Sequence, residues 1–326
     1  MDGDRKLGLG HVYNMLTILN QFRKDDILIV MHSKRKLGDY KFKGQLYKVV
    51  YFSDRKQLEK IIEEFKPDIV MNDILNTQAS YIKDIKKKGC FVVNFEDIGD
   101  GSKLADLMFS PIYDAKSTEK KKFGSSYACV RDEFRIWKNH SPKKNHTILI
   151  TFGGSDTRNM TLRTLKIIQK YELRNFKIQV ILGGGFSNTL SIKKLANKMI
   201  KTGFIIKLEE NSSIMAKHIL DSDFVFSSNG RTVFEIASLK IPFITISANP
   251  REEKHVFSRL SGGGIHLGLY SQVTDEKFKN AIKQMINPSV RRKFINNLEK
   301  YDLLNQVYEV TKLINSDYEK WRGIKP

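Results

Sequence analysis

Short apolar runs alternate with stretches of helical pattern along most of the chain. In the first half the apolar runs have the length of strands and lie at 27–31, 47–52, 69–71, 91–95 and 107–109. Helical patterns fill most of the intervals between them, as at 55–65 and 77–88. Strands that alternate with helices predict parallel sheets with helices on both faces. We therefore expect an α/β fold.

The same rhythm restarts in the second half. An apolar strand at 147–152 leads into Gly153-Gly154-Ser155-Asp156 and a helix from about Asn159. Further strands are expected at 177–182, 204–208, 224–227 and 244–247, and terminal helices at 299–321. The polar segments 114–124 and 138–145 interrupt the pattern. We place the linker in the second of them, where Ser141-Pro142 precedes a new strand.

A length of 326 residues fits two domains. We predict two Rossmann-like domains that face each other across a cleft, at 1–142 and 143–300, with helices of 301–326 packed back on the first. A glycine-rich loop normally follows a buried strand in such domains, yet only six residues precede Leu7-Gly8-Leu9-Gly10. We therefore expect the first domain to lack its first central strand and to have a less stable sheet.

Composition narrows the class of protein. The two cysteines, Cys90 and Cys129, make neither a disulfide framework nor a metal cluster, which suits a reducing cytoplasm. No apolar run approaches the roughly 18–20 residues of a membrane span. We expect a cytoplasmic protein, soluble or peripheral to a membrane.

The formal net charge of +20 admits two interpretations. One is a surface for anionic partners, such as acidic lipid or a diphosphate substrate. The other is general lysine usage, because the lysines are spread along the whole chain and clusters such as 86–88 and 120–122 suit solvated helix ends and loops. No zinc-finger, RNA-recognition or zipper signature is present, so we expect no dedicated nucleic-acid binding.

The first candidate motif is Gly8-Leu9-Gly10-His11, which opens a helix. Glycines let a backbone approach a ligand, and a helix N-terminus offers unpaired N–H groups. Tyr13 occupies the third glycine position of the dinucleotide fingerprint, so that motif is excluded. His11 suits acid–base chemistry near neutral pH. A capping or core histidine is the alternative.

The second candidate lies in the later half, where Gly153-Gly154-Ser155-Asp156 joins an apolar strand to a helix. A simple N-cap by Ser155 or Asp156 is the alternative interpretation. One such loop in each half favours a shared cleft between the domains.

The strongest segment is 224–235, where a buried strand ends in small hydroxyl residues and glycine before a helix. It predicts a diphosphate cradle with Ser228 and Thr232 as hydroxyl donors, Arg231 as a charge clamp and Glu235 as an acceptor for ribose hydroxyls. An ordinary capped helix is the alternative. The triplet Asp221-Ser222-Asp223 precedes its strand, away from carboxyl ends, and is rejected as a metal site.

Taken together, these motifs resemble a known family. They are Gly8-Leu9-Gly10-His11-Val12, Asp73, Glu96-Asp97, 127–134, 152–156, and 228–235 followed by Pro242 and Asn249. In this order, between residue 2 and about residue 268, they resemble the UDP-sugar hydrolase of pseudaminic acid biosynthesis and its relatives in spore-coat and surface-polysaccharide pathways. The wider kinship is with GT-B glycosyltransferases of the MurG type, which implies the GT-B fold.

The resemblance implies a reaction. Family members remove UDP from a diacetamido-trideoxyhexose by water attack at C1 with inversion, and they use neither metal nor cofactor. His11 matches the histidine that activates or orients the water. The implied nucleotide-binding residues are Gly153, Gly154, Ser228, Asn229, Gly230, Arg231, Thr232 and Glu235. The implied substrate-binding residues are Gly8, Gly10, Asn14, Asp73, Ser155, Asp156 and Asn249.

Three departures from the family pattern stand out. Asn14 takes the place of the usual arginine, Asn249-Pro250 that of Asn-Gln, and Asn229-Gly230-Arg231 is more polar than the usual glycine pair. They suggest a different nonulosonate precursor, or transfer of the sugar instead of hydrolysis. An inverting GT-B glycosyltransferase with a membrane-bound or protein acceptor and an inactive nucleotide-sugar-binding domain therefore stay open. Such domains also occur fused to a sugar cytidylyltransferase, which would account for the abrupt N-terminus.

Overall fold

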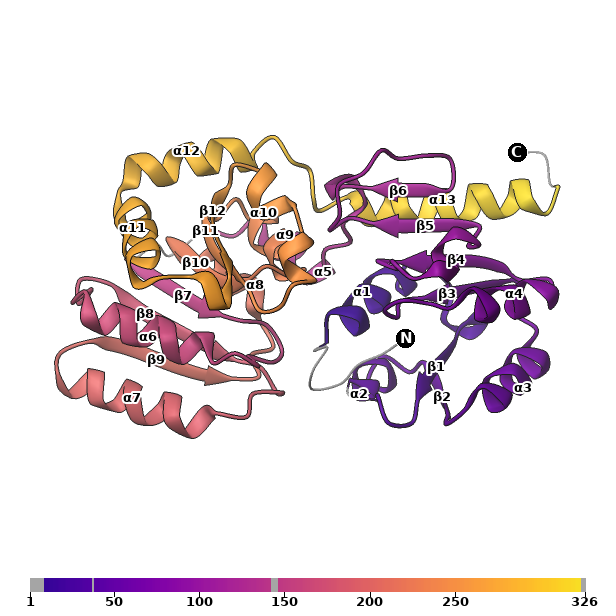
Figure 1. Cartoon of the computed structure of the whole chain (residues 1–326), viewed down its shortest axis with the longest axis horizontal. Coiled ribbons are helices and arrows are strands. Elements are labelled where there is room, and N and C mark those ends of the chain that lie inside the picture. The colour runs from indigo at the N-terminus through magenta and orange to yellow at the C-terminus, as the bar shows by residue number, and fades with distance from the viewer. Residues whose placement is uncertain (1–8, 37, 142–145, 324–326) are drawn as a thin grey trace. The chain divides into compact units, whose positions relative to one another are not determined.

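The computed structural model describes residues 9–36, 38–141 and 146–323. The chain divides into two compact units, one of residues 1–129 and 305–326 and the other Val130–Leu304 (Figure 1). The expected linker at Ser141-Pro142 runs into residues 142–145, which lie outside the described residues. Helix α5 (Asp132–Trp137) precedes that linker and belongs to the second unit.

The second unit is built on one parallel sheet of six strands in the order β12-β11-β10-β7-β8-β9. In chain order these strands are β7 (Thr147–Thr151), β8 (Lys177–Leu182), β9 (Ile205–Glu210), β10 (Phe224–Ser228), β11 (Phe243–Ser247) and β12 (Gly264–Leu269). The central strands are buried along almost their whole length, which suits a parallel sheet covered by helices. The α/β fold with parallel sheets is thus confirmed.

Helices of the second unit fall into two groups around this sheet. The first group, whose apolar side chains share one core with the strands, is α6 (Met160–Lys170), α7 (Thr189–Lys201) and α11 (Asp275–Ile286). The second group is α5, α8 (Met215–Leu220), α9 (Thr232–Ser238) and α10 (Phe257–Leu260), with α12 (Pro288–Leu298) following α11. Short 3-10 turns lie at Glu252–Lys254 and Tyr270–Gln272.

The first unit contains two parallel sheets. One pairs β1 (Leu28–His32) with β2 (Lys48–Phe52), and the other runs in the order β3 (Ile69–Asn72), β4 (Phe91–Phe95), β5 (Leu107–Ser110) and β6 (Lys121–Phe123). Every residue of β4 is buried. In β1 half-buried and buried residues alternate, and in β3 only the last residue, Asn72, is buried. Among the described residues, no strand precedes the first helix.

Helices from both ends of the chain close the core of the first unit. They are α1 (Gly10–Leu19), α2 (Asp39–Lys43), α3 (Arg55–Phe65), α4 (Ala79–Lys87) and α13 (Gln306–Trp321), with 3-10 turns at Lys24–Asp26, Asp100–Lys103 and Ser125–Tyr127. Val310 and Ile314 of α13 pack into the same cluster as Val12 of α1 and Phe91 of β4. The C-terminal segment therefore completes the unit in which the described chain starts.

Candidate functional site

In the second unit, the order of strands locates a ligand site. The chain proceeds from β7 outward through β8 and β9, then returns to the other side of β7 with β10, β11 and β12. The neighbours β7 and β10 thus lie where the direction of the sheet reverses, and open α/β sheets bind ligands outside the carboxyl ends of the strands at such a point. The loops that leave these two ends are 152–156 and 229–231. They contain two of the motifs singled out from the sequence.

Glycines bring the turns after these strands close together. Gly153 has φ +76°, and a Cβ added there would lie 4.0 Å from the Oγ of Ser228, the last residue of β10. The turn after β8, Gly183–Gly185, lies against the same loop, because a Cβ on Gly183 would lie 2.5 Å from the Gly153 carbonyl oxygen. Gly185 N also donates to the Gly154 carbonyl oxygen at 2.9 Å. The glycine-containing turns after β7, β8 and β10 therefore lie close together at this edge of the sheet.

The third turn, 183–185, was not predicted from the sequence. Its signal was present, since Gly183-Gly184-Gly185 follows an apolar run directly. A run of glycines after a buried strand indicates close approach of backbone to backbone or to a ligand.

Glu235 lies in the first turn of α9 and forms an ion pair within the second unit. Its Oε1 accepts a hydrogen bond from Arg131 Nε at 2.6 Å, and both side chains are mostly buried. Arg131 Nη1 also lies 3.2 Å from Glu133 Oε2. Glu235 is thus held in place by a guanidinium from the segment that enters the unit.

Asn229 positions the turn through its side chain. The amide nitrogen donates to the carbonyl oxygens of Glu252 at 2.8 Å and His255 at 3.1 Å, and the amide oxygen accepts from Ser258 Oγ at 2.7 Å. In return His255 Nδ1 donates to the Asn229 carbonyl oxygen at 2.6 Å. Burial lowers the pKa of His255 to about 4, so the ring is neutral near pH 7. Asn229 and His255 therefore fix the turn to the 252–258 segment.

Two further candidates serve as caps. Both Asp156 carboxylate oxygens accept backbone N–H groups at the start of α6, from Met160 at 2.8 Å and Thr161 at 2.7 Å. Asn249 Oδ1 accepts from the backbone N–H groups of Arg251 and Glu252, both at 3.0 Å. These contacts fit the capping alternative for Asp156, and both residues shape loops at the same edge of the sheet.

The first unit brings together three candidates from the sequence. His11, the second residue of α1, donates from Nδ1 to Asp73 Oδ1 at 2.5 Å, and Asn14 Nδ2 donates to Asp73 Oδ2 at 2.7 Å. Asp73 follows the last residue of β3 and is fully buried, and His11 is 7% exposed. Gly10 begins α1 beside this cluster, whereas Gly8 lies outside the described residues.

This arrangement has a chemical consequence. A carboxylate that accepts the Nδ1 proton fixes the tautomer of the ring, which leaves Nε2 as the nitrogen that can take up a proton. The second oxygen of Asp73 is held by Asn14, so the carboxylate cannot rotate away from the ring. The cluster thus holds the His11 ring in a fixed orientation and tautomer.

The neighbouring motif Glu96-Asp97 organises the same end of the sheet. Asp97 accepts hydrogen bonds from the backbone N–H groups of Thr77 at 2.9 Å and Gly99 at 2.8 Å, and from Asn94 Nδ2 at 2.7 Å. Glu96 is buried and has φ +53°. Asp97 therefore ties the loop after β3 to the loop after β4.

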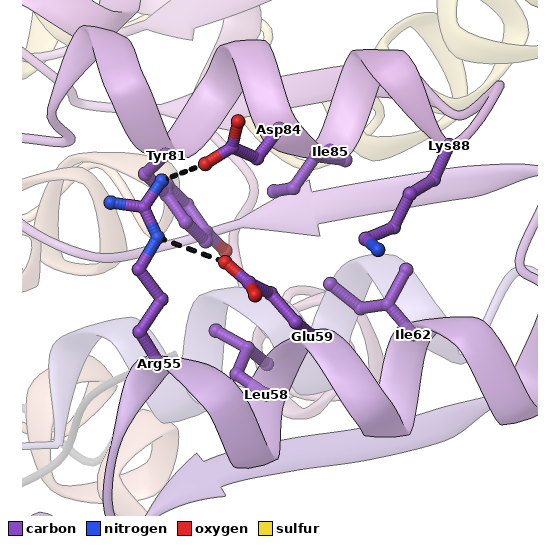
Figure 2. A pocket seen from close by; sticks show the side chains of 8 residues that line it. All are labelled: Arg55, Leu58, Glu59, Ile62, Tyr81, Asp84, Ile85 and Lys88. Carbon is purple, nitrogen blue, oxygen red and sulfur yellow. Dashed lines mark hydrogen bonds and ion pairs between the residues drawn. The ribbon is translucent and has the colours of Figure 1, made fainter.

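Figure 2 shows a hollow in the first unit, between α3 and α4. Leu58, Ile62 and Ile85 form its apolar lining, while Arg55 pairs with Glu59 on its own helix at 3.1 Å and with Asp84 on α4. None of the candidate residues from the sequence lines this hollow. Its apolar lining and ion pairs are those of two helices packed against each other, so we interpret the hollow as part of the contact between α3 and α4.

The sequence contains two acidic triplets of the form Asp-x-Asp, at 2–4 and 221–223. Asp223 lies at the N-terminal end of β10, where its carboxylate accepts from Thr147 N at 2.8 Å and from Arg291 Nη2 at 3.1 Å. Asp2-Gly3-Asp4 lies outside the described residues. In residues 9–36, 38–141 and 146–323 no cluster of three His, Cys, Asp or Glu side chains is arranged to hold a metal ion. None of the helices described is long and apolar enough to cross a membrane.

Comparison with known proteins gives one relative and many similar folds. No family model matches the chain. An uncharacterized protein of Methanocaldococcus jannaschii is 29% identical over 266 residues, which cover 76% of this chain and 54% of the relative. The chain thus spans about half the length of the curated relative that it matches.

Similar solved structures include three enzymes. MurG of Acinetobacter baumannii is 13% identical with a TM-score of 0.68, over 94% of this chain and 96% of that one. The UDP-GlcNAc 2-epimerase of Neisseria meningitidis bound to UDP-GlcNAc is 14% identical with a TM-score of 0.64, over 96% and 98%. MnaA of S. aureus with UDP is 13% identical with a TM-score of 0.66, over 97% and 95%. At these identities the likeness shows the fold, which is that of the GT-B class.

Proposed function

We propose that the chain hydrolyses a UDP-activated diacetamido-trideoxyhexose to UDP and free sugar, with inversion at C1 and without a metal or cofactor. The observation that carries the proposal is the buried His11–Asp73 pair, which has the geometry of an oriented general base. The sequence resemblance supplies the sugar class and the inversion. The proposal assigns activation of water to the first unit and the nucleotide to the second.

The second unit supports a nucleotide diphosphate at the edge formed by β7, β8 and β10. Backbone N–H groups of the glycine turns and the hydroxyls of Ser228 and Thr232 suit phosphate oxygens, and Arg231 supplies a positive charge. Glu235 is the carboxylate that fits ribose hydroxyls. Two of the similar structures hold UDP or UDP-GlcNAc, which supports a UDP-sugar as the ligand.

The reaction balances without a further reagent. A water oxygen attacks C1 as Nε2 of His11 takes up one of its protons, and the bond from C1 to the UDP oxygen breaks. UDP leaves with the electron pair, and its negative charge is met by the donors of the second unit. Attack from the face opposite the leaving group inverts C1.

The test is incubation of the purified chain with the UDP-sugar and EDTA, followed by chromatography for UDP and NMR for the sugar anomer. We expect stoichiometric UDP and free sugar of inverted configuration, and loss of both in His11→Gln. UDP release that requires an acceptor would establish the glycosyltransferase. Interconversion of UDP-sugars without UDP release would indicate an epimerase, and UDP binding without any turnover would indicate the inactive binding domain.

The remaining expectations stay predictions from the sequence. They are cytoplasmic location, peripheral contact with anionic lipid, the absence of dedicated nucleic-acid binding, and fusion to a sugar cytidylyltransferase.

A further inference from the structure

Arg131 lies on the segment by which the chain enters the second unit and donates from Nε to Glu235 Oε1 at 2.6 Å. None of the functional interpretations above uses it. Its Nε donates to Glu235, its Nη1 pairs with Glu133, and its guanidinium lies 5.1 Å from the centre of the Phe134 ring. Phe134 is fully buried, so the Arg131 guanidinium contacts a fixed ring in addition to the carboxylates of Glu235 and Glu133.

Glu133 is itself fixed in place. Its Oε1 accepts the backbone N–H of Ala216, near the start of α8, at 2.6 Å. The chain of contacts therefore runs from α8 through Glu133 and Arg131 to Glu235 on α9. Since each member is at most one-fifth exposed, the contacts are shielded from bulk water.

We propose that Arg131 is a positioning residue that lets Glu235 distinguish a ribonucleoside diphosphate from its 2′-deoxy analogue. This inference rests on the proposed function, because it takes Glu235 as the ribose acceptor. A carboxylate offers about four lone-pair positions, and Arg131 occupies one of them on Oε1. The vicinal hydroxyls of ribose supply two donors for the others, whereas a 2′-deoxyribose supplies one.

The role of Arg131 follows from the flexibility of glutamate. A free glutamate side chain loses rotamer entropy when it is fixed, which weakens any binding that has to fix it. Arg131 fixes the carboxylate before the nucleotide arrives, so both hydroxyls meet it in one orientation. Without Arg131 the Glu235 carboxylate can turn toward one hydroxyl or toward solvent. The second hydroxyl of ribose then adds less to the affinity, and UDP is less strongly preferred over 2′-deoxy-UDP.

The experiment is titration calorimetry of the full chain with UDP and with 2′-deoxy-UDP. We expect wild type to prefer UDP by about tenfold or more, the effect of one hydrogen bond to a charged group. Glu235→Gln should remove most of this preference, which tests the proposed ribose contact on its own. Arg131→Met should also reduce the preference to about threefold or less, with 2′-deoxy-UDP affinity within about twofold of wild type.

Controls separate positioning from folding. Arg135→Ala is the matched variant, because Arg135 lies on α5, the helix that Arg131 precedes, and pairs with Asp132. It should keep the full preference. Arg131→Lys retains the charge without the fork of donors and should recover part of the preference lost in Arg131→Met. Thermal unfolding of each variant shows whether it is folded. If Arg131→Met does not fold, the preference of Arg131→Lys for UDP over 2′-deoxy-UDP is compared with that of wild type instead.

Several outcomes would overturn the inference. If Arg131→Met weakens UDP and 2′-deoxy-UDP equally, Arg131 is only a clamp between helices. If it changes neither, the contact is without consequence for the nucleotide. If wild type binds both nucleotides equally well, or Glu235→Gln keeps the preference, the ribose contact itself is wrong and the inference falls with it. If wild type binds UDP not at all, the proposed function fails first.

Discussion

At the scale of single residues, the His11–Asp73 pair makes a prediction about protonation. In Asp73→Asn the amide would donate to Nδ1 of His11, which moves the ring proton to Nε2 and removes the acceptor. We expect the rate constant for UDP release to fall by about 10²–10⁴-fold, the range of loss when a general base is disabled. UDP affinity should stay within a few-fold, since the residues that we propose for nucleotide binding lie on the second unit.

Rapid-quench assays of UDP release and calorimetry with UDP measure the two quantities. Asp100→Asn is the control, because Asp100 accepts the backbone N–H of Ala79 in the same unit at an exposed site. It should turn over at the wild-type rate. A normal rate in Asp73→Asn would show that His11 works without an oriented tautomer, and the general-base assignment would be wrong.

The buried His255 predicts a loss of stability in acid. Burial and the neighbouring arginines Arg231, Arg251 and Arg259 lower its pKa to about 4, whereas an unfolded histidine has its ordinary value near 6.5. Between about pH 4 and pH 6.5, His255 is therefore protonated in the unfolded chain and neutral in the folded chain. Stability is complete above about pH 6.5 and falls as the pH drops toward 4, by up to about 3 kcal/mol.

Urea unfolding of wild type and His255→Gln from pH 4 to pH 7.5 isolates this contribution. The free energy of unfolding of wild type should rise with pH across the window more steeply than that of the variant. Burial raises the pKa of Glu252, which acts in the opposite direction and is common to both proteins. Parallel curves for the two proteins would contradict the assignment to His255.

The sequence predicted individual chemical groups better than their contacts. His11, Asn14 and Asp73 were all named from motifs, yet their hydrogen bonds span about sixty positions and depend on how α1 lies over the end of β3. Asn229 was predicted to contact the nucleotide. Its side-chain partners at 247–258 are separated from it by a whole strand–helix unit, so no local pattern could reveal its structural use.

At the scale of elements, the meeting of the glycine turns predicts the effect of one methyl group. A Cβ on Gly183 would lie 2.5 Å from the Gly153 carbonyl oxygen, and backbone cannot yield easily. Gly183→Ala should therefore displace the loop after β7 and weaken UDP binding, with an overpacking cost of about 1–3 kcal/mol. Calorimetry with UDP measures the affinity.

Gly184→Ala is the matched neighbour. Its added Cβ would meet Asn211 Oδ1 at 2.9 Å, the end of a side chain that can rotate away. We expect UDP affinity close to wild type. Equal weakening in both variants would mean that the turn after β8 acts by general destabilisation, and wild-type affinity in Gly183→Ala would remove this turn from the nucleotide site.

Two edge strands, β6 and β12, were not predicted from the pattern, whereas the edge strands β3 and β9 were. The short strand β6 consists of Lys121, Lys122 and Phe123, inside a segment interpreted as a polar interruption. Edge strands need no continuous apolar run, and lysines are common there because they discourage pairing with other chains. The interior strands β4, β7 and β10 were predicted nearly to the residue, since burial on both faces demands an apolar run.

At the scale of the whole molecule, the division into two units predicts where a nucleotide acts. Every residue that we propose for UDP binding lies in Val130–Leu304, and the proposed general base, His11, lies in the other unit. Saturating UDP should therefore slow hydrogen exchange at 152–156, 183–185 and 228–235. Exchange in the core strand β4 of the first unit should not change. At a UDP concentration of 100 times Kd, the stabilisation of the binding unit should approach about 2.7 kcal/mol.

Exchange measured by mass spectrometry on the full chain, with and without UDP, tests this localisation. Glu235→Gln provides the comparison, because it should reduce protection at a fixed UDP concentration without altering exchange in the absence of ligand. Protection that appears around His11 and Asp73 and leaves the three turns unchanged would reverse the assignment of nucleotide and base to the two units. The general base would then have to be sought in the second unit, where the half-buried His255 donates from Nδ1 to the carbonyl oxygen of Asn229 in the turn after β10.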